Sequence, residues 1–308
     1  MPQWDLVNSD CILVMGSNMA ENHPIAYRFV LQAKQKGATT IHVDPRFTRS
    51  SALADIYAPL RAGSDIAFLG GIINHILQND LWFRDFVLPY TNLATIIGPD
   101  YKGPDELGGL FSGWNEEGQR YSVESWQYDG VVMPSALAES YVEIEGFAEA
   151  TKRLHDGPTP KDMTLQHPRC VYQIMRRHYA RYTPEMVERV TGCPRDVFVQ
   201  IADTVARNSG RERTTCFAYA LGWTQHSLGA QFIRTAAILQ LLMGNVGRPG
   251  GGILALRGHT SIQGSTDIPT LYDMLPGYLA QPHAFKPHDD LASYLEAETN
   301  PTGWWHNL

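Results

Sequence analysis

Short apolar runs alternate with amphipathic stretches along the first part of the chain. Cys11–Met15 is a continuous apolar run, which predicts a strand buried on both faces of a parallel sheet. Apolar residues then recur at helical spacing over Ile25–Lys36, with Pro24 suited to the first turn and Gly37 to the C-cap. Thr39–Val43 is a second strand-like run. Together these segments predict a β-loop-α-β unit, the building block of a doubly wound, mostly parallel αβα sheet.

The same alternation continues along the chain, with one interruption. Further strands are predicted at Ile56–Leu60, Thr215–Ala220 and Ile253–Leu256, a loop at Leu221–Gly229, and helices at Asp65–Gln78, Trp82–Val87, Cys170–Tyr179, Thr183–Val190, Arg195–Arg207 and Ala230–Leu242. Between Gly98 and about Pro168, glycine, proline, aromatic and charged residues dominate. This stretch is too aromatic for a disordered linker and indicates an insertion with short irregular elements.

Composition narrows the class of protein. The formal net charge is -7, which argues against a nucleic-acid-binding protein. No apolar run reaches the length of a membrane span, and no signal peptide is expected before the first strand. None of the four cysteines (Cys11, Cys170, Cys193 and Cys216) belongs to a C-x-x-C pair, so spacing predicts no metal ligands. Cys11 and Cys216 lie in apolar runs and are expected to be buried small hydrophobic residues.

The loop after the first strand is a candidate ligand-binding segment. Ligands of open α/β sheets bind beyond the carboxyl ends of the strands. Gly16 allows the backbone to approach a ligand closely, and Asn18 and Glu21 can hydrogen-bond to amino and hydroxyl groups. An ordinary β–α turn is the alternative. The loop contains no G-x-G-x-x-G fingerprint for a nicotinamide dinucleotide.

The end of the second predicted strand carries an acidic and a basic residue. Asp44 stands where the ribose hydroxyls of a dinucleotide are bound, and Arg46 suits a phosphate or a planar ring. Pro45 fixes the backbone between them. A structural salt bridge is the alternative.

A third candidate segment is the turn before the predicted helix at Asp65–Gln78. Gly63 and Ser64 could offer free N–H groups to an anion, and Asp65 could offer a carboxylate to a purine. A plain helix N-cap by Ser64 or Asp65 is equally compatible with the sequence.

Two further segments follow buried strands in the second half. Leu221–His226 combines aromatic and polar residues with Gly222, which is typical of a ligand-facing loop, although His226 alone suggests a surface or capping histidine. After the last strand, Arg257 and His259 would point to one side of an extended chain. Arg257 could bind a small carboxylate and His259 could relay a proton. The alternative is a salt bridge with a solvated histidine.

Taken in order and spacing, seven segments resemble the large subunit of formate dehydrogenases, within the bis-molybdopterin guanine dinucleotide oxidoreductases of the dimethyl sulfoxide reductase superfamily. They are GSNMAENHP (16–24), VDPR (43–46), ADIYAP (54–59), LQHPR (165–169), YALGWTQH (219–226), MGNVGRPGGG (243–252) and LRGHTSIQG (256–264). The resemblance covers nearly the whole chain and is nearest to the respiratory, membrane-complex type.

This resemblance implies αβα domains around two pterin guanine dinucleotides that chelate molybdenum or tungsten. Residues 1–260 would form a dinucleotide-binding domain with the insertion at about 98–168, and residues 261–308 would begin a following, truncated αβα domain. The residues implied to contact the cofactor are Gly16, Asn18, Glu21, Asp44, Pro45, Arg46, Gly63, Asp65, Leu221, Gly222, Gln225 and Gly258. Arg257 would orient formate, and His259 would lie beside it.

The resemblance also implies parts that this sequence does not contain. The family carries an N-terminal 4Fe–4S domain, a selenocysteine or cysteine bound to the metal, and a long C-terminal part. We therefore expect an internal fragment that does not oxidise formate alone; a reading frame opened downstream of a selenocysteine codon would explain it. The implied partners are an iron–sulfur subunit and a membrane cytochrome subunit, at the periplasmic face of a membrane, with a cytoplasmic location also possible. A nitrate-reductase-like enzyme and a non-catalytic pterin-binding module or inert fragment are the alternatives.

Overall fold

The computed structural model describes residues 1–122, 125–130, 159–257 and 281–298. The chain divides into two units, Met1–Leu256 and Arg257–Leu308. In the second unit the described residues form one helix, α14 (Leu291–Ala297), which is capped by the Asp290 carboxylate accepting from the Ser293 N–H. Among the described residues, no helix is long and apolar enough to cross a membrane.

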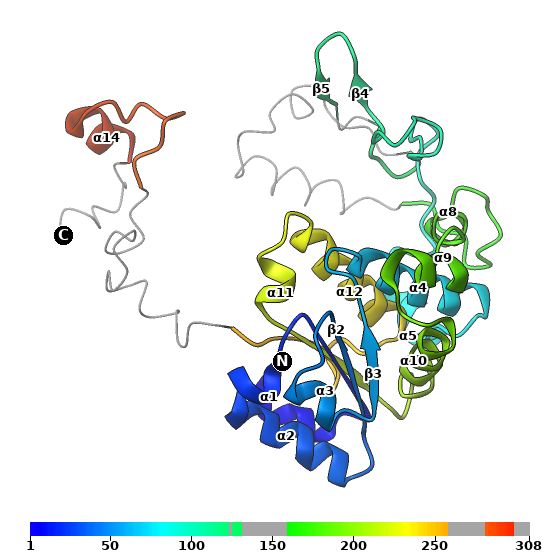
Figure 1. Ribbon diagram of the computed structural model, residues 1–308. Coiled ribbons are helices and arrows are strands. Elements are labelled where there is room, and N and C mark those ends of the chain that lie inside the picture. The colour runs from blue at the N-terminus through cyan, green and yellow to red at the C-terminus, as the bar shows by residue number, and fades with distance from the viewer. Residues whose placement is uncertain (123–124, 131–158, 258–280, 299–308) are drawn as a thin grey trace. The chain divides into compact units, whose positions relative to one another are not determined.

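The first unit is built on a five-stranded parallel sheet (Figure 1). The strands, in the order β3-β2-β1-β6-β7, are Ile56–Pro59, Thr39–Asp44, Cys11–Met15, Thr215–Tyr219 and Gly252–Ala255. The predicted parallel pairing of the first two strands is confirmed, because β1 pairs with β2 from Cys11↔Thr39 to Met15↔Val43. The chain proceeds outward from β1 through β2 and β3, then returns to the other side of β1 with β6. The topological switch point, where such sheets bind ligands, therefore lies between β1 and β6.

Helices cover both faces of this sheet, as predicted for the αβα class. Their bounds are η1 Gln3–Asn8, α1 Met19–Asn22, α2 Pro24–Gln35, α3 Arg49–Leu53, α4 Asp65–Gln78, α5 Arg84–Tyr90, α8 Val171–Tyr179, α9 Pro184–Thr191, α10 Arg195–Arg207, α11 Leu221–Thr224 and α12 Gly229–Leu242. Alternate residues of β1 enter two separate cores. Leu13 and Met15 pack with α4, α10 and α12, whereas Ile12 and Val14 pack with η1 and α2. This is the alternation expected of a strand buried on both faces.

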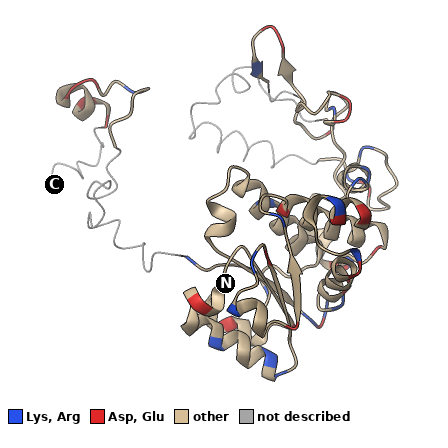
Figure 2. Ribbon diagram, viewed as in Figure 1, with Lys and Arg blue, Asp and Glu red and all other residues tan. Residues whose placement is uncertain are grey.

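Charged residues of both signs are interspersed over the helices that flank the sheet (Figure 2). Several of them form ion pairs, such as Lys34–Asp55 at 2.8 Å and Arg195–Glu185 at 2.8 Å. These pairs are partly or largely exposed, so each contributes little to stability.

Two predicted elements are corrected. The segment predicted as helical from Trp82 begins its helix only at Arg84, since Trp82 turns inward to donate its indole N–H to Asp80 at 2.7 Å. The predicted loop Leu221–Gly229 contains the helical turn α11, in which the Trp223 N–H donates to Ala220 O at 3.1 Å. Trp223 is fully buried, and its burial stabilises a turn that local propensity does not favour.

Within the part of the insertion that is described, the only strands are the short pair β4 (Trp114–Asn115) and β5 (Arg120–Tyr121), which form an antiparallel hairpin. Isolated bridges such as Ile97↔Tyr128 join its ends to the rest of the first unit. The insertion therefore carries short irregular elements there, as its composition indicates.

Candidate cofactor-binding site

Four loops meet at the carboxyl edge of the sheet, as predicted. The Gly222 N–H donates to Gly16 O at 3.1 Å, which joins the loops after β1 and β6 across the switch point. The Trp223 indole N–H donates to Asp65 Oδ1 at 3.1 Å and so brings the turn before α4 to the same place. The loop after β2 lies beside the loop after β1, because their strands pair in parallel.

Glycine is required where the first two loops touch. Gly16 has φ +69°, and a Cβ there would lie 2.8 Å from Trp223 Cδ1. A Cβ on Gly222 would lie 2.7 Å from Gly16 O and 2.8 Å from Gly16 Cα. Since these neighbours are backbone or a fully buried indole, neither can move aside cheaply. The close approach of the two loops therefore requires glycine at both positions.

A cavity of about 560 Å³ opens beyond the ends of β1 and β2. Its lining residues are Asn18, Glu21, Asn22, Asp44, Arg46 and Thr48. Two carboxylates, two amides and a guanidinium thus belong to residues around one open space, while the Thr48 hydroxyl oxygen is itself buried. Pro45 is exposed in the turn between Asp44 and Arg46, where Asp44 Oδ1 accepts from the Arg46 N–H at 2.8 Å.

The predicted residues therefore fall into two groups. Asn18, Glu21, Asp44 and Arg46 line the cavity, and Pro45 shapes it. The other group surrounds the switch point and consists of Gly16, Gly63, Asp65, Leu221, Gly222 and Gln225; none of these lines the cavity. Leu221, Gly222 and Gln225 are exposed, whereas Asp65 is buried.

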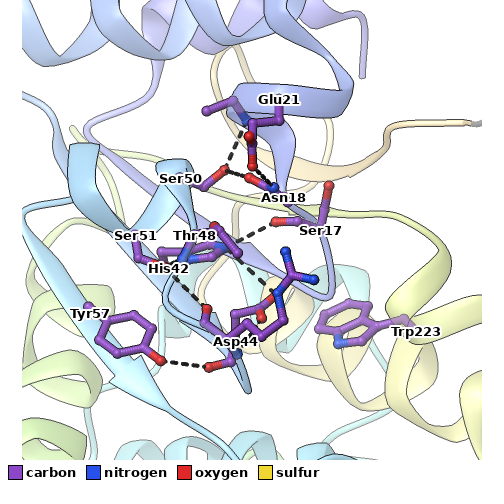
Figure 3. A network of polar contacts seen from close by, with 12 residues as sticks. Ser17, Asn18, Glu21, His42, Asp44, Thr48, Ser50, Ser51, Tyr57 and Trp223 are labelled. Carbon is purple, nitrogen blue, oxygen red and sulfur yellow. Dashed lines mark hydrogen bonds and ion pairs between the residues drawn. The ribbon is translucent and has the colours of Figure 1, made fainter.

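One wall of the cavity is held by a chain of polar contacts (Figure 3). Asn18 Oδ1 accepts from the Ser50 hydroxyl at 3.0 Å, so the Asn18 amide nitrogen faces Glu21 and donates to its carboxylate. The other Glu21 oxygen lies 3.3 Å from Arg49 Nε. This chain fixes which end of the Asn18 amide points to Glu21, which sequence alone leaves open.

Asp65 is buried, and its surroundings shift the pKa of its carboxyl in opposite directions. Burial raises the pKa of its carboxyl, while the hydrogen bond from Trp223 and the nearby His226 act in the opposite direction. Ser64 does not cap α4, because its hydroxyl donates to Arg61 O at 2.6 Å. His226 lies against Gly63, with its Cε1 3.2 Å from where a Gly63 Cβ would be. It is half-buried.

The segment after β7 differs from the extended chain that the sequence suggests. Arg257 has φ +49°, in the left-handed region, so the chain turns there rather than continuing straight. Arg257 and His259 were expected to point to one side because side chains two residues apart do so along an extended chain. Since the chain is not extended at Arg257, that reason does not apply there. Gly258 and His259 lie outside the described residues.

The four cysteines are all buried. Burial raises the pKa of the Cys11 and Cys193 thiols to about 12, and it also raises the pKa of the Cys216 thiol. Burial of this kind disfavours the thiolate form. Cys11 and Cys216 are 0% exposed, as predicted for buried small hydrophobic residues.

His42 is a site residue that the sequence reasoning missed. It is 1% exposed in β2, with its ring between the loops that form the two cavity walls (Figure 3). The available signal was one titratable side chain in the middle of a strand predicted to be buried, since such groups are rarely buried without partners.

Comparison with known proteins identifies the class to which this fold and site belong. The Molybdopterin oxidoreductase family matches residues 2–295, and the chain belongs to that family. Its relatives include the major subunit of formate dehydrogenase-O from Escherichia coli (strain K12), 44% identical over 296 residues that cover 96% of this chain and 26% of the relative. The formate dehydrogenase subunit alpha of Megalodesulfovibrio gigas is 41% identical over 308 residues, covering 99% of this chain and 28% of the relative.

The chain spans about a quarter of the length of these relatives. The formate dehydrogenase major subunit of Haemophilus influenzae is 44% identical over 279 residues, which cover a similar share of that relative, 25% of its length. Among solved structures, acetylene hydratase from Pelobacter acetylenicus aligns with a TM-score of 0.43 and 19% identity, over 79% of this chain and 24% of that chain.

The residues at the carboxyl edge fit the nucleotide part of a molybdopterin cofactor. The cavity supplies acceptors for amino and hydroxyl groups and one guanidinium for a phosphate. Two buried polar atoms nearby, Ser17 Oγ and His226 Nδ1, have no hydrogen-bond partner among the described protein atoms. Buried polar atoms are nearly always satisfied, so a bound ligand or water is the natural partner for both.

Proposed function

We propose that this chain is the pterin guanine dinucleotide-binding part of a formate dehydrogenase catalytic subunit, which oxidises formate to carbon dioxide. The observation that carries the proposal is the meeting of four loops at the switch point, beside a polar cavity, in a member of the Molybdopterin oxidoreductase family. The 41–44% identity to formate dehydrogenase subunits supports formate as the substrate.

In this proposal the cavity holds the guanosine end of the cofactor. Asp44 accepts from the ribose hydroxyls, because its Oδ2 makes no hydrogen bond among the described residues. Glu21 and Asn18 bind the donor-rich edge of guanine, and Arg46 pairs with a phosphate or stacks on the ring.

The switch-point group lies beside the pterin end. Gly16, Gly63 and Gly222 allow close backbone approach, while Leu221 and Gln225 contact the cofactor from the exposed side of α11. Asp65 positions Trp223 through its hydrogen bond. When bound, the bis-molybdopterin guanine dinucleotide, with molybdenum or tungsten, supplies the chemistry that takes two electrons from formate.

Arg257 and His259 are the proposed substrate residues. Arg257 orients formate by pairing with its carboxylate, because a guanidinium matches a carboxylate in bidentate geometry. Gly258 gives the cofactor access to the backbone between them, and His259 holds or moves a proton near neutral pH.

In this proposal, the complete enzyme contains further domains and subunits besides this chain. Residues 1–260 form the dinucleotide-binding domain, and residues 261–308 begin the next αβα domain. In the complete enzyme, a 4Fe–4S cluster elsewhere in the catalytic subunit would carry electrons to an iron–sulfur subunit and a membrane cytochrome, at the periplasmic face.

A nucleotide titration tests the proposed cofactor site. We expect the 308-residue chain to bind GDP at least about tenfold more tightly than ADP, because adenine lacks the paired N–H donors that a carboxylate accepts. Isothermal titration calorimetry of the chain and of Asp44→Asn measures this. Asp44→Asn should weaken GDP binding, whereas Asp85→Asn, a change in an exposed ion pair, should not. Equal affinity for GDP and ADP would contradict the proposal.

A further inference from the structure

His42 connects the two walls of the cavity. Its Nε2 lies 3.0 Å from the Ser17 carbonyl oxygen, in the loop after β1. Its Nδ1 lies 2.8 Å from Ser51 Oγ in α3. Ser51 Oγ in turn accepts from the Thr48 N–H at 2.8 Å, and Thr48 lines the opposite wall. The ring therefore lies between Ser17, next to Asn18, and the segment that carries Arg46 and Thr48 (Figure 3).

The partners of His42 fix its tautomer. A carbonyl oxygen can only accept, so the proton of a neutral ring must be on Nε2, which donates to Ser17. Nδ1 is then an acceptor, and the Ser51 hydroxyl donates to it at 2.8 Å rather than to the Arg46 carbonyl oxygen, which lies farther away at 3.4 Å. Ser51 is thereby oriented to accept from the Thr48 N–H. The three hydrogen bonds run in one direction, from Thr48 through Ser51 and His42 to Ser17.

The neutral ring also leaves Asp44 available to a ligand. Asp44 Oδ2 is 3.9 Å from His42 Nε2, which exceeds hydrogen-bonding distance. A charged ring would pair with that oxygen and would lose Nδ1 as an acceptor for Ser51. Burial favours the neutral form, since it lowers the pKa of His42.

An apolar residue would serve a purely structural role better. The neighbours of His42 in β2, Ile41 and Val43, are buried and apolar, and strands of this kind are normally apolar throughout. An imidazole at this position loses hydration that only its two hydrogen bonds restore. Unlike an apolar side chain, the imidazole can link two loops through its two hydrogen bonds.

We propose that His42, acting through Ser51, is a positioning residue that holds the two cavity walls at the separation that a guanine nucleotide requires. This inference rests on the proposed function, because it concerns the same cavity. The neighbouring Ser50 supports the arrangement from the same helix: its Oγ accepts from the Ala20 N–H at 2.9 Å and its hydroxyl orients Asn18.

Four variants of the full 308-residue chain test the inference by GDP titration. His42→Val suits the strand but has neither nitrogen, and we expect GDP binding about tenfold weaker. His42→Gln places an amide N–H near the position of Nε2 and should recover binding to within about threefold of wild type. Adding Ser51→Ala to His42→Val should cause little further loss, because both residues act in one chain of hydrogen bonds.

The matched control is His75→Leu. His75 Nε2 lies 2.8 Å from Asp203 Oδ1, away from the cavity, so its removal should lower stability without changing GDP affinity. Nitrogen-15 NMR of histidine-labelled chain should place the His42 proton on Nε2.

Three outcomes separate the inference from the proposed function. A wild-type chain that binds GDP, together with a folded His42→Val that binds equally well, would overturn the inference alone. A proton on Nδ1 would overturn it too, since Ser51 could not then donate to the ring. A wild-type chain that does not bind GDP would overturn the proposed function and the inference together.

Discussion

At the scale of single residues, the protonation of His42 should couple stability to pH. Burial, the largest influence, lowers the pKa of His42 below its ordinary value of 6.5, while Ser17 and Asp44 partly oppose this. The unfolded chain therefore binds a proton more readily than the folded one. The stabilising contribution is fully present above about pH 6.5 and is lost as pH falls below that value toward the folded-state pKa.

Urea unfolding at several pH values measures this effect. We expect the free energy of unfolding to fall between pH 7.5 and pH 5, with a smaller fall in His42→Val than in wild type. Subtracting the variant's curve removes shared contributions, including that of Asp65, whose raised pKa acts in the opposite sense. Superimposable pH dependence in the two proteins would show that His42 titrates alike in both states.

The periodicity of the sequence could reveal that position 42 is buried but not what its ring does. The segment Thr39–Val43 is predicted as a strand, and that prediction includes His42 without assigning a role to its ring. Its partners, Ser17 and Ser51, lie in separate loops whose proximity depends on the tertiary fold. Asn18, Glu21, Asp44 and Arg46, by contrast, lie at or within a few residues of the ends of β1 and β2, where ligands of such sheets bind.

At the scale of elements, the contact between the loops after β1 and β6 should be intolerant of added atoms. A Cβ at Gly222 would meet Gly16 backbone atoms at 2.7–2.8 Å, and backbone cannot rotate away. We expect Gly222→Ala to lower the free energy of unfolding by about 1–3 kcal/mol, the usual cost of overpacking.

Gly103→Ala provides the control for that substitution. A Cβ at Gly103 would meet only Glu106 Oε2, at an ordinary 3.6 Å, so stability should change by less than about 0.5 kcal/mol. Chemical denaturation of both variants measures the difference. Equal stability of the Gly222→Ala variant and wild type would mean that the two loops separate without cost.

Elements with a strong local signal were the predictable ones. The helices Asp65–Gln78 and Arg195–Arg207 have the bounds expected from apolar spacing. The turn α11 was missed because it depends on burying Trp223 against Tyr219, with ring centroids 5.0 Å apart, and on the bond to Asp65. The position of β6 beside β1 could likewise not be predicted from the local sequence pattern, since nothing in either strand specifies which strand it pairs with.

At the scale of the whole molecule, we expect the isolated chain not to oxidise formate. It spans about a quarter of the length of its formate dehydrogenase relatives, and its four thiols are buried. A formate-dependent dye-reduction assay on the purified chain, beside an intact formate dehydrogenase, measures this. Turnover comparable with the intact enzyme would show that the catalytic groups have been misassigned.

The two halves of the site differ in how much chain must be made before they can form. The His42–Ser17 bond joins residues 25 positions apart, and the His42–Ser51 bond joins residues nine apart. The Trp223–Asp65 bond spans 158 positions. During synthesis the walls of the cavity can therefore assemble as soon as the chain through α3 has left the ribosome, because closing short loops is fast and costs little entropy. The switch point must wait until the whole insertion and three helices have followed, so the contact between Trp223 and Asp65 forms later than the walls of the cavity.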